Sequence, residues 1–143
     1  MGLELPKGLI SPKEAKELNQ QFIKTRSQDL NKIVKKESGN PKKEDAISSW
    51  FSLEEIKKYI AYVESENSNV NGLRVYFGAY SNSDKKQGKK DLSTVFIVPT
   101  VPLTGSLQKD GVTGDDDGGS DLDDLEGLNN GSIGNPPSAQ YPQ

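Results

Sequence analysis

The first third of the chain has apolar residues three or four positions apart, which is the spacing of one face of a helix. Before this pattern, Ser11 and Glu14 have the spacing of a capping box, which satisfies free amide groups at a helix start. After it, Gly39 is the residue type that most often ends a helix. The pattern therefore predicts one long helix between Ser11 and Gly39, with its apolar stripe at Ala15, Leu18, Phe22, Ile23, Leu30, Ile33 and Val34.

A second helix is predicted after Ser52, because Glu55 follows it in the spacing of another capping box. Its apolar face consists of Leu53, Ile56, Tyr59, Ile60 and Val63. The preceding segment, Asp45–Phe51, is expected to form a short helical turn. We expect this turn to place Trp50, the single tryptophan, in the core between the helices and the sheet, in preference to a ligand platform.

Two later segments, Leu73–Tyr80 and Leu92–Val98, have the composition of strands, and a polar loop joins them. In the first, every second residue is apolar and is expected to face the helices. These residues are Leu73, Val75, Phe77 and Ala79. The second segment is apolar on both sides and is expected to be the better-buried strand. The chain therefore predicts an α+β fold, in which two or three helices pack on a small antiparallel β-hairpin sheet.

The composition changes after Thr104. Residues 1–104 carry a net charge of +4, whereas residues 105–143 carry a net charge of −7 and eight glycines. A segment of this kind buries too little apolar area to offset the entropy cost of ordering it. We therefore expect a folded domain over residues 1–104 and a disordered, Gly/Asp-rich acidic tail over residues 105–143.

The chain contains neither cysteine nor histidine. This removes disulfides, thiolate chemistry, the usual general base and the commonest transition-metal ligand. No Gly-rich phosphate loop is present either, so we expect a non-enzymatic protein without a cofactor. The N-terminus has no signal-peptide pattern and no apolar run reaches membrane-spanning length, which predicts a cytoplasmic protein without a membrane partner.

Two basic features are candidates for binding. Arg74, Tyr76 and Tyr80 share one side of the first strand, where they suit the stacking of bases or an anionic ligand. Cross-strand stabilisation of the sheet is the alternative reading of that side. The hairpin loop carries four lysines that suit phosphate contacts, or that simply keep the loop soluble. They are Lys85, Lys86, Lys89 and Lys90.

The acidic run between residues 115 and 126 has two further readings. Four of its side chains match positions of a calcium-binding loop, but the required glycine and the flanking helices are missing, so no metal site is expected. They are Asp115, Asp117, Asp123 and Glu126. Three leucines, Leu122, Leu125 and Leu128, also recur three apart among acids, as in segments that dock in a groove of a partner. A tail that only aids solubility is the alternative.

The strings SWFSLEEIKKYIAY, NGLRVYFGAY and STVFIVPT resemble a small bacterial protein family with no assigned activity. The resemblance covers residues 49–100. Its motifs are core and turn residues, so it implies a fold and transfers no site.

Two functional hypotheses follow. The first is an interaction or adaptor protein with a protein partner, whose acidic tail is a docking segment or an intramolecular competitor for the basic hairpin loop. The second is a nucleic-acid-binding module that uses the lysine-rich loop and the side of the strand with Arg74, Tyr76 and Tyr80. The sequence leaves the identity of the partner and the oligomeric state open.

Overall fold

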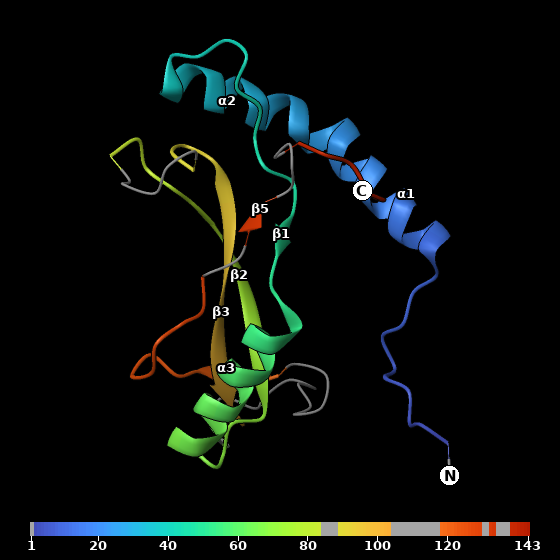
Figure 1. Ribbon diagram of the computed structural model, residues 1–143, viewed down its shortest axis with the longest axis vertical. Coiled ribbons are helices and arrows are strands. Elements are labelled where there is room, and N and C mark those ends of the chain that lie inside the picture. Colours follow the sequence, from blue (N-terminus) through green and yellow to red (C-terminus); the bar gives the residue numbers. More distant parts are fainter. Residues whose placement is uncertain (1, 84–88, 104–117, 130–131, 134–137) are drawn as a thin grey trace.

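The computed structural model describes residues 2–83, 89–103, 118–129, 132–133 and 138–143. It confirms the α+β class, with one long helix, a shorter helix and an antiparallel three-stranded sheet (Figure 1). Within the described residues, none of the helices combines the length and the apolar composition that a membrane span requires.

The long helix consists of α1 (Pro12–Phe22), a π-helical turn η1 (Ile23–Ser27) and α2 (Gln28–Ser38). The capping box is present, since the Ser11 Oγ accepts from the Glu14 N–H at 3.1 Å and the Ser11 N–H donates to Glu14 Oε2 at 2.7 Å. Gly39 ends the helix with a left-handed φ of 69°. The predicted start and end are therefore confirmed.

The apolar stripe of the long helix is covered only at its C-terminal part. Val34 is buried in a cluster with Ala46 and Leu92, whereas α1 contains no buried residue. Leu18 is 65% exposed. The expected burial of the stripe is therefore wrong for α1, because this end of the helix extends beyond the sheet (Figure 1).

The segment before the second helix is extended, so the predicted helical turn at residues 45–51 is wrong. Its residues Ser49–Trp50 form β1, which pairs antiparallel with β5 (Ser132–Ile133). Neighbouring residues of a strand point to opposite sides. Ser49 lines a groove toward the hairpin, and Trp50 therefore points the other way, with 64% of its surface exposed, rather than into the core.

The second helix, α3 (Leu53–Glu66), begins as predicted, with the Ser52 Oγ accepting from the Glu55 N–H at 3.0 Å. Its buried residues are Tyr59 and Val63, which pack with Ile97 of the sheet. Glu54 and Lys58 form an exposed ion pair on its outer side, with Lys58 Nζ 2.9 Å from Glu54 Oε1. In Figure 1, α3 lies at the end of the hairpin opposite to α2.

The sheet has the strand order β2 (Gly72–Ala79), β3 (Ser93–Val101) and β4 (Ser120–Asp121). β2 and β3 form the predicted antiparallel hairpin, with Tyr76 opposite Phe96. β3 is the central strand and the better buried of the two, as expected. The third strand was not predicted, and it comes from the acidic C-terminal region.

The segment 118–129, which we call the C-terminal arm, differs from the disordered tail that the composition suggested. It lies along the outer edge of β3, where Leu122 N–H donates to Pro99 O at 2.9 Å. Leu128 and Ile97 exchange two backbone hydrogen bonds at 2.8 and 2.9 Å. Backbone pairing and apolar contacts with Tyr59 and Val63 supply the order that composition alone does not indicate. Residues 104–117 lie outside the described residues.

The odd-numbered residues of β2 lie on the side of the sheet that faces the helices, as predicted, since Val75 pairs with Ile97 beneath α3 and Phe77 lines a groove with Phe22 and Leu30 of the long helix. The expected coverage of this side is wrong. All four residues that were assigned to the helix-covered side are exposed, and Phe77 is 89% exposed. The reason is that α3 covers β3 through Ile97, while β2 is the edge strand of the sheet. A strand pattern predicts which residues share a side, but the packing of the other elements decides how far that side is covered.

Candidate interaction surface

The side of β2 with Arg74, Tyr76 and Tyr80 meets the C-terminal arm. The carboxylate of Asp121 accepts hydrogen bonds from Arg74 Nη1 and from the Tyr76 hydroxyl. Arg74 Nη2 also donates to the carbonyl of Gly119 at 2.9 Å. The side chains of Arg74 and Asp121 are 34% and 30% exposed, so this ion pair is half-buried. The predicted anion-binding arginine is thus engaged by an acid of its own chain.

Tyr76 is held from two directions. Its ring stacks on the ring of Phe96, with centroids 5.3 Å apart and planes inclined by 15°. Its hydroxyl donates to Asp121, and this hydrogen bond raises the pKa of the Tyr76 phenol above 10.0, because a phenolate cannot donate to a carboxylate. The cross-strand aromatic pair that was the alternative reading of this side is therefore present.

Tyr80 contacts the arm as well. Its hydroxyl donates to Asn129 Oδ1 at 2.9 Å and lies 3.3 Å from Thr94 Oγ1. Lys89 Nζ lies 6.0 Å from the centroid of the Tyr80 ring. Lys90 is exposed. Lys85 and Lys86 lie outside the described residues.

The three leucines of the acidic run are half-buried within the fold itself. Leu125 and Leu128 pack against the cluster of Tyr59, Val63 and Ile97. Leu122 is held through its backbone by Pro99. The segment that was predicted to dock on a partner thus docks on its own sheet.

Two of the four residues of the calcium-type pattern belong to the part of the chain that the structure describes. Asp115 and Asp117 lie outside the described residues, whereas Asp123 and Glu126 are exposed on the arm. Within the described part, no group of three or more acidic side chains is placed to hold a metal ion.

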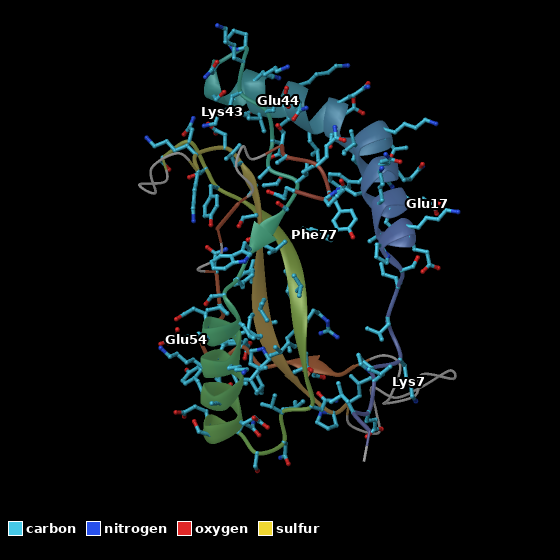
Figure 2. The ribbon with its side chains drawn as sticks, turned by 45° about the vertical axis from the view of Figure 1, so that its right-hand side comes forward. Lys7, Glu17, Lys43, Glu44, Glu54 and Phe77 are labelled. Carbon is cyan, nitrogen blue, oxygen red and sulfur yellow. The ribbon has the colours of Figure 1, made fainter. Side chains whose placement is uncertain are left out.

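An apolar groove, which sequence reasoning missed, lies between the long helix, the extended segment 46–49 and the hairpin. Its volume is about 420 Å³. Phe77, opposite Val95 in the hairpin register, lies on the side of β2 that is turned toward the long helix (Figure 2). The groove is lined by Phe22, Leu30, Ala46, Ile47, Ser48, Ser49, Phe77, Gly78, Ser93, Thr94 and Val95. Only the alternating apolar residues of β2 could have indicated it from the sequence.

The outer edge of β2 directs backbone groups away from the hairpin. Tyr80 N–H donates to Leu92 O at 3.0 Å, in register with the pair Ala79 and Ser93. In an antiparallel pair, residues that hydrogen-bond to the partner strand, such as Tyr80, alternate with residues whose N–H and C=O groups point away from it. The outward-pointing residues are therefore Leu73, Val75, Phe77 and Ala79. Among the described residues, no strand pairs with this edge.

A second apolar surface lies at the start of the chain. Leu3, Leu5 and Leu9 are 87%, 64% and 63% exposed, and the segment that carries them lies away from the sheet (Figure 1). This is more exposed apolar side-chain surface than scattered single residues produce. Like the β2 edge, it is a surface that suits contact with another protein.

These features define an α+β protein with an open, apolar edge strand. A comparison of the chain with known protein families, with characterised proteins and with solved structures finds no match. The resemblance to a small bacterial family therefore stays a prediction.

Proposed function

We propose that this protein is a non-enzymatic interaction protein that binds an extended, apolar segment of a protein partner along β2. The observation that carries this proposal is Phe77, 89% exposed on an open edge strand and beside an apolar groove. Addition of a strand to a sheet edge uses backbone hydrogen bonds for affinity and side-chain pockets for specificity. β2 and the groove offer both.

The chemistry of the groove supports binding rather than catalysis. Among the described residues, its lining consists of apolar side chains and hydroxyls without an ionisable side chain. General acid–base catalysis needs a titratable group within hydrogen-bond reach of the substrate. The buried carboxylate nearby, Asp45, is already engaged by Ser93 and Ala46.

The proposal is tested by selecting binders from a random peptide library on the full chain. We expect enrichment of peptides in which apolar residues alternate with others, because only one side of an added strand faces the groove. The affinity of selected peptides, measured by fluorescence anisotropy, is expected to fall at least tenfold in Val75→Pro. Proline removes an N–H that points to the open edge and leaves the bonds to β3 in place.

Leu3→Asp is the control, since Leu3 is also an exposed apolar residue but lies outside β2. Its affinity for the selected peptides is expected to equal that of the unmodified chain. A selection that enriches no peptide, or enriches peptides whose affinity Val75→Pro leaves unchanged, would contradict the proposed function.

Binding of a nucleic acid is a second candidate function. It is favoured by the ion pair of Arg74 with the Asp121 carboxylate, because a phosphate group could take the place of that carboxylate. On this reading Asp121 competes in cis for Arg74 and Tyr76, and the C-terminal arm is autoinhibitory. Asp121→Asn is then expected to strengthen binding of a single-stranded oligonucleotide, with a steep loss as salt rises. Arg74→Ala in the same background should abolish the gain. Equal affinities of all three chains at low salt would contradict this candidate.

A further inference from the structure

We propose that the segment bound along β2 is β2 of a second copy of this chain. The two strands pair antiparallel about a two-fold axis at Tyr76 and join the two three-stranded sheets into one. This inference rests on the proposed function, because it names the partner of the same edge. The register of the hairpin, the side chains of β2 and the unblocked edge of this strand all support the pairing.

The backbone limits where the two-fold axis can lie. Outward-pointing residues of one copy must meet outward-pointing residues of the other, and in β2 these are the odd-numbered ones. The axis must therefore pass through a residue and not between two. With the axis at Tyr76, Val75 meets Phe77 of the second copy, and Leu73 meets Ala79. An axis at Val75 or at Phe77 leaves outward-pointing residues of β2 unpaired.

The side chains of β2 complement one another in this register. The pair of Val75 with Phe77 is an aromatic and β-branched pair, which is among the favourable cross-strand combinations. Arg74, the one charged residue of β2, meets Gly78 of the second copy, so no like charges face each other. The two Tyr76 side chains meet at the axis.

The exposed apolar area of β2 becomes continuous across the axis. Phe77, Val75 and Leu73 are 89%, 55% and 38% exposed, and all three share one side of the strand. A stable interface buries about 800 Å² per partner, and a phenylalanine contributes about 150 Å² or more of that. The exposed leucines of the N-terminal segment offer further apolar area to a second copy.

The edge of β2 also lacks the features that prevent strands from pairing. Natural edge strands are commonly blocked by lysine, proline or a bulge. β2 contains neither lysine nor proline, its register with β3 is unbroken over eight residues, and its one arginine is neutralised by Asp121. β3, by contrast, has its outer edge covered by the C-terminal arm. In the described part of the chain, the fold therefore covers one edge of the sheet and leaves the other open to a symmetric partner.

The register is tested by cysteine cross-linking, since the chain contains no cysteine of its own. Tyr76→Cys places two thiols opposite each other at a pair without backbone hydrogen bonds, where the Cα atoms are about 4.5 Å apart, within disulfide range. We expect rapid formation of a covalent dimer under mild oxidation. In Leu73→Cys the two thiols are about 20 Å apart along the strands, and we expect none. Equal cross-linking of both variants, or none in Tyr76→Cys, would overturn the inference.

Sedimentation equilibrium of the full chain gives a readout without cysteine. We expect twice the chain mass, a single chain mass for Val75→Pro, and twice the chain mass for Val75→Thr, which keeps the N–H and the branched side chain. A monomeric chain that still binds selected peptides along β2 overturns the second-copy inference and leaves the proposed function intact. A monomer that binds no such peptide overturns both.

Discussion

At the scale of single residues, Asp45 joins three parts of the fold. Only 1% of its surface is exposed. Its carboxylate accepts from the Ser93 N–H at 2.6 Å, from the Ser93 hydroxyl and from the Ala46 N–H at 2.9 Å. Its own N–H donates to Asn31 Oδ1 of α2 at 2.7 Å. This one residue therefore connects the long helix and the extended segment to the start of β3.

Asp45→Ala is expected to lower the free energy of unfolding by about 3 kcal/mol, because it leaves buried donors of Ser93 and Ala46 without their acceptor. Urea unfolding followed by circular dichroism measures this. Glu44→Ala, which removes an exposed neighbouring carboxylate, is the control and should stay within about 0.5 kcal/mol of the unmodified chain (Figure 2). A similar small effect for Asp45→Ala would contradict the role of its carboxylate.

Ser27 is also a buried polar residue, but unlike Asp45 its side chain makes no hydrogen bond within the described residues. Its hydroxyl lies in the π-helical turn. Ser27→Ala removes an unsatisfied buried polar group and adds the better helix former. We expect a gain of about 1 kcal/mol in the free energy of unfolding, measured by urea unfolding. A loss of stability in this variant would show that the hydroxyl is satisfied after all.

At the scale of elements, Tyr59 fastens α3 to the sheet and to the C-terminal arm. Its hydroxyl donates to the carbonyl of Glu126 at 2.8 Å and lies 3.3 Å from the carbonyl of Ile97. Burial raises the pKa of the Tyr59 phenol above its ordinary value of 10.0. Two carbonyl acceptors cannot bind a phenolate, so the folded chain favours the neutral form.

This pKa predicts a loss of stability at alkaline pH. A group whose pKa is higher in the folded than in the unfolded chain stabilises the fold below its unfolded pKa, and the contribution is lost as pH rises through the folded pKa. We therefore expect Tyr59 to stabilise the fold below pH 10 and to lose this contribution above it. Tyr59→Phe should be less stable at pH 7, and its stability should fall less steeply above pH 10.

Urea unfolding at a series of pH values between 7 and 11 measures the difference. Tyr141→Phe, which removes an exposed phenol near the end of the chain, is the control and should follow the unmodified chain. Parallel pH profiles for Tyr59→Phe and the unmodified chain would contradict the assignment.

At the scale of the whole molecule, the C-terminal arm is part of the folded unit. It adds β4 to the sheet, and Leu125 and Leu128 complete the core beneath α3. Truncation after Thr104 is therefore expected to expose Ile97 and the edge of β3 and to lower the free energy of unfolding by a few kcal/mol, about 1 kcal/mol for each half-buried leucine plus the lost backbone pairing. Thermal unfolding of residues 1–104 against the full chain measures this. An unchanged unfolding temperature would show that residues 1–104 fold independently.

The candidate site was only partly predictable from the sequence. The alternation in β2 correctly placed Arg74 and Tyr76 on one side of the strand, because side-chain direction follows from backbone geometry. Nothing in the local pattern indicated that Asp121 binds both, because the contact joins residues 45 and more positions apart. The groove was missed for the same reason, since its walls come from the helix, the extended segment and the hairpin.

The sequence by itself determined the ends of the long helix, the start of α3 and the β2–β3 hairpin. Capping residues, glycine and strand alternation act over a few positions, where the backbone alone decides the outcome. The absence of thiol and imidazole chemistry is likewise a property of composition. Only the tertiary structure decided that Trp50 points outward, that an acidic segment completes the sheet, and that β2 keeps an open apolar edge. Each depends on which distant segment covers a surface, and burial is a property of the packed molecule.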